Sequence, residues 1–274
     1  MLLELIPAFG GRIGRLAFEG LDVLVPLTAT SFDPVAWPQA GAYPMIPYHN
    51  RIETGRLCLN GHVHTIASHK NAAPHSLHGP AQRDPWTVIS QSKHQIVLQL
   101  DRDADEHWPW AFRAQQDFAL LPDGLKLTLT VVNQSGESMP AGLGWHPYVA
   151  QCRQVQHDAE YNWPIGLDYL PAGGRQAVGH CHADLVTGTS YYSCWSQLEI
   201  ETGSGLALSI TATPVLSHLV LHKGDGDYVC VEPVSHLANG FNMHDRGVLG
   251  TGTRILIPGE ELSGTISVTV RRAG

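Results

Sequence analysis

The stretch GLKLTLTVVN, residues 124–133, decides the fold class, because apolar and polar residues alternate along it. Its apolar positions are Leu125, Leu127, Leu129 and Val131, with lysine or threonine between them. Successive side chains of a β-strand point to opposite faces, so this pattern predicts a strand with one buried face. The segment GTISVTVRR, residues 264–272, repeats the alternation and predicts a second strand of the same kind.

Two later segments predict antiparallel hairpins. QLEIETGSGLALSITAT, residues 197–213, turns at Gly-Ser-Gly, and HLVLHKGDGDYVCVEP, residues 218–233, turns at Gly-Asp-Gly. Glycine supplies the positive φ angles that hairpin turns need. Helical periodicity is weak, and 28 glycines with 18 prolines interrupt the chain at short intervals. We therefore expect an all-β protein in which two large, curved antiparallel sheets pack face to face as one domain over residues 1–274.

The composition excludes several classes of partner. The chain has 274 residues, 43% of them hydrophobic and 15% charged, as expected for a folded globular protein. A net charge of −8, with no basic cluster longer than Arg-Arg, disfavours nucleic-acid binding. No stretch approaches the roughly 20 apolar residues of a membrane span, and no basic region precedes the short apolar run at the start. We expect a cytoplasmic protein without nucleic-acid or membrane partners.

Metal and disulfide sites are poorly supported by the cysteine and histidine patterns. The five cysteines are scattered and form no CxxC pair. His62 and His64, in GHVH, would share one face of a strand as in a cupin metal site, but the following TIASHK lacks the glutamate that a cupin needs. The run HCH, residues 180–182, has no evident partner ligand. We expect no metal or other cofactor, with a metal-dependent β-barrel enzyme as the alternative.

Four segments combine aromatic residues, glycine or proline with a group that can act as acid, base or cation. They are YPMIPYHNRIETGRL (43–57), HSLHGPAQRDPW (75–86), MPAGLGWHPYVA (139–150) and YVCVEPVSHLANGFN (228–242). Loops on a rigid scaffold usually carry the binding groups of a protein. These four segments can form one functional site only if the fold brings them together in space.

Glu232 and His146 are the acid–base candidates of these segments. The alternation of DYVCV directs Val229 and Val231 to one face and Glu232 to the other, which places Glu232 at the end of a strand, and Pro233 stiffens the turn that follows. A solvated strand-terminal glutamate is the alternative, since glutamates are mostly exposed. His146 stands between a tryptophan and a Pro-Tyr pair, and it is either a structural loop residue or a functional one.

The remaining candidates would bind a ligand. Arg51, next to Asn50, can form paired hydrogen bonds with a carboxylate or with ligand hydroxyls, or it can be an ordinary surface arginine. His78 precedes Gly-Pro and has the same ambiguity as His146. The aromatic residues, among them Trp145, can stack on a sugar ring or fill the core.

Read in order, these segments resemble the aldose 1-epimerase (galactose mutarotase-like) family nearly end to end. The opening LIPAFGGRIGRLAFEGLDVLVP, residues 5–26, is similar to the first hairpins of that family, and the other segments are similar to its Asn-Arg, His-Gly, His-Pro-Tyr and glutamate motifs. The resemblance implies a galactose mutarotase-like β-sandwich that interconverts the α and β anomers of a hexose without a cofactor.

The resemblance also implies roles for single residues. The general base of the family maps onto Glu232, its general acid onto His146, a second ring-contacting histidine onto His78, and its substrate-binding arginine onto Arg51 beside Asn50. Reference pKa values then predict an ionised Glu232 and a His146 that is about one quarter protonated at pH 7. A carboxylate and an imidazolium on opposite sides of the anomeric carbon and ring oxygen would open and reclose the sugar.

One departure from the family pattern bears on which sugar is bound. Family members usually carry an aspartate between the His-Pro-Tyr and glutamate motifs, whereas the corresponding GTSYYSCW, residues 188–195, contains no acid. Asp168 and Asp184 lie nearby without aligning. The alternatives are a hexose 6-phosphate 1-epimerase, with Arg56 and Arg83 as candidate phosphate ligands, and a non-catalytic carbohydrate-binding protein on the same fold. We expect a monomer or homodimer that binds a hexose or a sugar phosphate.

Overall fold

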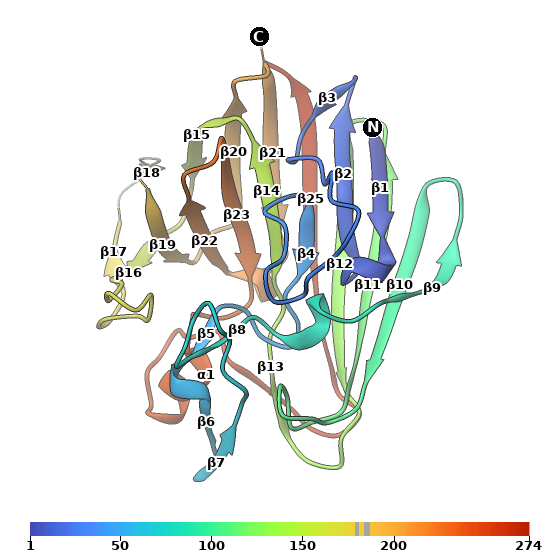
Figure 1. The fold of residues 1–274 in the computed structure, drawn as a ribbon. Coiled ribbons are helices and arrows are strands. Elements are labelled where there is room, and N and C mark those ends of the chain that lie inside the picture. The colour runs from blue at the N-terminus through green and yellow to red at the C-terminus, as the bar shows by residue number, and fades with distance from the viewer. Residues whose placement is uncertain (179–180, 184–186, 274) are drawn as a thin grey trace.

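Strands dominate the fold (Figure 1), and the computed structural model describes residues 1–178, 181–183 and 187–273. Within this part of the chain, the first large sheet has ten strands in the order β1 (Leu2–Ile6), β2 (Arg12–Phe18), β4 (Ala42–Pro44), β14 (Trp145–Ala150), β23 (Tyr228–Val234), β22 (His218–Lys223), β19 (Gly188–Ser193), β16 (Tyr161–Trp163) and β17 (Gln176–Ala177), with β3 (Leu21–Asp22) paired to β2.

A second large sheet has nine strands within the described residues. Their order is β18 (Cys181–Ala183), β15 (Cys152–His157), β20 (Gln197–Thr202), β21 (Leu206–Ala212), β25 (Glu261–Arg272), β12 (Gly124–Asn133), β11 (Phe112–Leu121), β10 (Gln95–Arg102) and β9 (Thr87–Gln91). All pairings in both sheets are antiparallel, as the sequence predicted.

Small sheets and short helical segments complete the described part of the fold. Across the described ranges, three two-stranded sheets pair β5 (Arg51–Ile52) with β8 (Ser76–Leu77), β6 (Arg56–Leu59) with β7 (His62–Thr65), and β13 (Met139–Ala141) with β24 (Arg254–Leu256). The helices are α1 (Gly240–Asp245) and the 3₁₀ turns Pro7–Phe9, Glu53–Gly55, Pro80–Gln82 and Pro214–Leu216. None of the helices seen in the described residues has the length and apolar character that crossing a bilayer requires.

The hydrophobic core joins the two large sheets. Leu127 of β12 and Ile266 of β25 share one buried cluster with Val229 and Val231 of β23, although these strands belong to different sheets. Each of these side chains is at most 1% exposed. The alternation of β12 is therefore explained by burial of its leucine face between the sheets, and the predicted sandwich of two large antiparallel sheets is confirmed.

Both predicted hairpins are present. Strands β20 and β21 pair with Ile200 opposite Leu208, and strands β22 and β23 pair with Val220 opposite Glu232. The prediction that Glu232 ends its strand was wrong, because β23 continues through Pro233 to Val234. Glu232 therefore lies inside the strand, and paired residues before and after it hold its backbone in place.

The face of β23 that carries Glu232 points away from the inter-sheet core. Cys230 belongs to a second apolar cluster together with Tyr43, Tyr148 and Val220, on the opposite side of the first sheet. This second face is where the chain can present polar groups without interrupting the core.

Candidate active site

A pocket of about 290 Å³ lies on this second face of the first sheet. It is lined by Asn50, Arg51, Asn71, Leu77, His78, His146, Tyr169, Thr189, Val220, His222 and Glu232. Ligand pockets typically measure about 300–1,000 Å³, so this one suits a small molecule. Five of the six predicted site residues converge here from four separate segments of the sequence: Glu232, His146, His78, Arg51 and Asn50.

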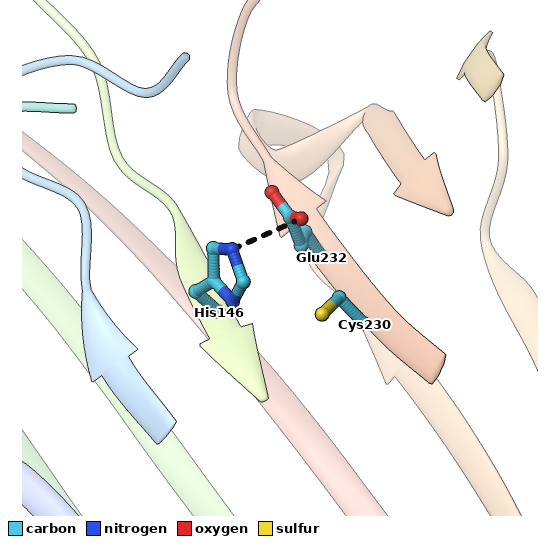
Figure 2. A group of neighbouring side chains, drawn as sticks. All are labelled: His146, Cys230 and Glu232. Carbon is cyan, nitrogen blue, oxygen red and sulfur yellow. Dashed lines mark ion pairs between the residues drawn. The ribbon is translucent and has the colours of Figure 1, made fainter. Parts of the chain in front are cut away.

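The pairing of β14 with β23 brings the acid–base candidates together. Tyr148 lies opposite Cys230 in this pair. Two residues from them along each strand, His146 and Glu232 point toward each other (Figure 2), and both line the pocket. His146 Nε2 lies 3.3 Å from Glu232 Oε1. The residues are only 7% and 3% exposed, so water screens their interaction weakly.

Burial shifts both titrations away from the reference values. It raises the pKa of Glu232 to about 8. It also lowers the pKa of His146 to about 3, with smaller contributions from His222 and from the positive charge of Arg12. Desolvation penalises the charged form of each group, so at neutral pH the protonated carboxyl of Glu232 faces a neutral His146 ring. The prediction of an ionised glutamate beside a partly protonated histidine was wrong, because reference values ignore burial.

A buried cation lies behind His146. The Tyr43 ring stacks on the His146 ring with centroids 4.5 Å apart and planes 19° apart. The Arg12 guanidinium carbon lies 4.4 Å from the centroid of the same tyrosine ring, and Arg12 is fully buried. Arg12 donates to the carbonyl oxygen of Ala40 at 3.0 Å, but its Nε and one terminal nitrogen have no partner. This charge disfavours a second positive charge on His146.

The Asn-Arg and His-Gly segments are tied to each other beside the pocket. Strand β5 pairs with β8, with Arg51 opposite Leu77. The Asn50 backbone N–H donates to His78 Nδ1 at 3.0 Å, and the His78 backbone N–H donates to the Asn50 carbonyl oxygen at 2.9 Å. Because His78 Nδ1 accepts and burial holds its pKa well below the usual range, the ring is neutral and carries its proton on Nε2. His78 can therefore donate to a ligand oxygen.

Arg51 is held by neutral groups. Its guanidinium carbon lies 4.5 Å from the ring centroid of Tyr169, and one terminal nitrogen donates to Asn50 Oδ1 at 3.3 Å. The hydroxyl of Tyr191 donates to the Tyr169 carbonyl oxygen at 2.8 Å and so fixes the loop that carries Tyr169.

Trp145 does not belong to the pocket, and its predicted role in sugar binding was wrong. It precedes His146 on β14, and adjacent residues of a strand point to opposite faces. Since His146 faces the pocket, Trp145 faces the inter-sheet core, where it is 2% exposed. Its indole fills the core rather than stacking on a ligand.

Sequence reasoning missed His222 and Thr189, which line the same pocket. They lie opposite each other on β22 and β19, and Thr189 Oγ1 is 2.8 Å from His222 Nδ1. The alternation of HLVLHK contained the signal for His222, because Leu219 and Leu221 enter the core while Val220 faces the pocket. The stretch without an aspartate thus contributes a neutral threonine.

Neither of the two acids near that stretch was assigned a role from sequence, and the one that the structure describes, Asp168, gains none. Asp168 does not line the pocket, and its carboxylate accepts a hydrogen bond from the Leu170 backbone at 3.3 Å. Asp184 lies outside the described residues.

One group of side chains has the spacing of metal ligands. Ligand atoms of His146, Cys230 and Glu232 lie within 4.8 Å of one another, and all three residues are buried (Figure 2). These donors are types that zinc accepts. Among the described residues no other such group occurs, so His62 and His64 do not join a third ligand there. Of the HCH run, His180 lies outside the described residues.

Comparison with known proteins identifies the family. The family model for aldose 1-epimerase matches residues 5–192, which is more than half of the chain. The chain therefore belongs to the aldose 1-epimerase family. The matched range includes Arg51, His78 and His146 but ends before Glu232, so the assignment of Glu232 rests on geometry and on the sequence motif around it.

A curated relative and two solved structures match most of the chain. The uncharacterized protein YphB of Escherichia coli K12 is 25% identical in an alignment of length 264, and the match covers 84% of this chain and 84% of YphB. The crystal structure of a candidate aldose 1-epimerase from E. coli K12 is similar with a TM-score of 0.84 at 24% identity, covering 98% of this chain and 95% of that one. A galactose mutarotase-like protein from Clostridium acetobutylicum has a TM-score of 0.83 at 24% identity, with coverage of 98% and 92%.

Proposed function

We propose that this protein is an aldose 1-epimerase, an isomerase that interconverts the α and β anomers of an aldose without a cofactor. The observation that carries the proposal is the contact between His146 Nε2 and Glu232 Oε1, 3.3 Å apart at the wall of a small pocket. Family membership supports the same reaction class.

Ring opening requires one base at the anomeric hydroxyl and one acid at the ring oxygen. The pair supplies both, because it holds a single proton that can lie on either residue. We propose that this proton passes from Glu232 to His146 when the sugar binds, after which Glu232 deprotonates the hydroxyl and His146 protonates the ring oxygen. The open-chain aldehyde rotates about its C1–C2 bond and recloses with the two roles exchanged.

The other pocket residues would hold the sugar in place. His78 can donate through Nε2, and Arg51 and Asn50 can bind sugar oxygens, since the polar groups of a buried ligand must be paired. Alignment of the reacting atoms by such contacts accounts for a large part of the rate enhancement of many enzymes.

The competing proposal is a non-catalytic sugar-binding protein on this fold. Pure α-anomers of several aldoses, followed by polarimetry and by proton NMR exchange, separate the two proposals. An epimerase accelerates the approach to anomeric equilibrium in proportion to protein concentration. A binding protein perturbs the sugar signals while leaving the exchange rate at that of the buffer.

A further inference from the structure

We propose that the sugar bound in this pocket carries one negative charge, as a hexuronic acid does, and that Arg51 binds its carboxylate. The inference rests on the proposed function, since it names the substrate class of the same site. The inference follows from the charges of the groups that line the pocket and from the lack of a carboxylate partner for Arg51 among the described residues.

Arg51 is the source of the net charge of the pocket. In the described part of the chain, Glu232 is the only carboxylate among the lining residues, and it lies 3.3 Å from His146. That pair is neutral overall. Burial holds the pKa of His78 well below its usual range, and burial with the nearby Arg51 charge lowers the pKa of His222. One positive charge therefore remains, on Arg51.

That positive charge has no carboxylate partner within 4 Å in the described residues. Glu53 lies two positions further along the chain, but its carboxylate lies 3.6 Å from Arg246 and accepts from Asn239 instead. The contacts of Arg51 are an amide oxygen and an aromatic face, neither of which carries a charge. A guanidinium that faces a pocket without an internal partner favours an anionic ligand, because the ligand supplies the missing charge.

A neutral donor lies beside this cation. If the Thr189 hydroxyl donates to His222 Nδ1, across their 2.8 Å separation, the proton of the neutral His222 ring lies on Nε2. His222 then adds a hydrogen-bond donor next to Arg51. A carboxylate accepts hydrogen bonds through both of its oxygens. It can therefore bind the Arg51 guanidinium and the His222 N–H at the same time.

The count of cations favours a carboxylate over a phosphate. A phosphate monoester carries about −1.5 to −2 at neutral pH. The two arginines considered as phosphate ligands do not line the pocket: Arg83 contacts His107 at 3.2 Å, and Arg56 lines a different pocket. One cation therefore faces the ligand, which matches a singly charged sugar.

Three substrates of one stereochemical series test the inference: glucose, glucuronate and glucose 6-phosphate, together with the corresponding galactose set. Anomer exchange is measured by NMR, and binding of each sugar is measured separately by calorimetry at low and high salt. We expect kcat/KM and affinity for the hexuronate to exceed those for the neutral hexose by about tenfold or more at low salt, with the difference shrinking as salt screens the charge.

Three variants locate the effect. Arg51→Gln removes the cation, and Asn50→Asp places a carboxylate where an amide oxygen already lies 3.3 Å from Arg51. Both should abolish the preference for the hexuronate. The control Asn60→Asp adds the same charge at the exposed turn between β6 and β7 and should leave the preference unchanged. Circular dichroism checks that each variant is folded.

Equal kcat/KM and affinity for the hexose and the hexuronate would overturn the inference, as would a preference that persists in Arg51→Gln. Stronger binding and turnover of the 6-phosphate would overturn the single-charge assignment. Failure of the proposed function gives a different result: no sugar shows accelerated exchange, while the calorimetric comparison still reports whether the pocket prefers an anion.

Discussion

His146 Nε2 lies 3.3 Å from Glu232 Oε1, and each residue is more than nine-tenths buried. Two groups so close and so desolvated titrate as a unit, and their apparent pKa values belong to the pair. The protonation of this pair links the structure to the proposed reaction.

The pair predicts a broad pH profile. Activity requires that the pair holds one proton. The pair loses this proton as the pH rises through the raised pKa of Glu232, about 8. It gains a second proton as the pH falls toward the lowered pKa of His146, about 3. We expect kcat/KM for anomer exchange to be flat across neutral pH and to fall above about pH 8. Unshifted groups would instead give a decline above about pH 6.5.

The raised pKa of Glu232 also predicts a cost in stability. The unfolded chain ionises this carboxyl near its model value of 4.5, whereas the folded chain resists ionisation up to about 8. The unfolded state therefore binds fewer protons in this range, and stability falls as the pH rises from about 4.5 to about 8. Glu232→Gln should raise the free energy of unfolding by about 2–4 kcal/mol at pH 8 and by much less at pH 5. Urea titrations at both pH values measure the difference, and equal gains at both would contradict the assigned shift.

Arg12 is predicted to act on His146 through Tyr43. Arg12→Met keeps most of the side-chain volume and removes a buried charge that has no carboxylate partner, so we expect the variant to fold. Without that charge His146 becomes more basic, and the acid limb of the pH profile should move upward. The control is Arg15→Met on the same strand, where the arginine pairs with Asp22 at 2.7 Å near the surface. If both variants give the wild-type profile, Arg12 has no electrostatic role in the site.

Metal removal distinguishes acid–base chemistry from a metal-dependent reaction. Dialysis against a chelator should leave anomer exchange unchanged, and Cys230→Ser should retain activity because the proposed steps do not use the thiol. Added zinc is expected to inhibit by binding His146, Cys230 and Glu232, and less so in Cys230→Ser. Loss of activity on chelation, restored by a metal, would favour the metal-dependent alternative.

Much of the fold could be predicted because its signals are local. The alternation in residues 124–133 reports a strand buried on one face, and the glycine turns of the two hairpins report antiparallel neighbours. Alternation also predicted correctly that Glu232 lies on the opposite face from Val229 and Val231. The single-domain organisation and the monomeric or dimeric state stay predictions.

The site was less predictable because its properties depend on burial and on contacts between distant strands. Trp145 was assigned to the sugar from its place next to His146, although strand geometry sends neighbours to opposite faces. The pKa shifts follow from desolvation, which no sequence motif reports. Nothing around Arg12 in the sequence indicates that its charge is fully buried behind Tyr43.

The most direct test of the central claim is the rate of anomer exchange, measured by proton NMR at pH 7 for the wild type, Glu232→Gln, His146→Gln and the exposed control Glu201→Gln. We predict that each of the two site substitutions lowers kcat by about 10²-fold or more, since a positioned acid or base contributes roughly 10²–10⁴. The control should match the wild type. Site variants that are folded and exchange anomers at the wild-type rate would contradict the account.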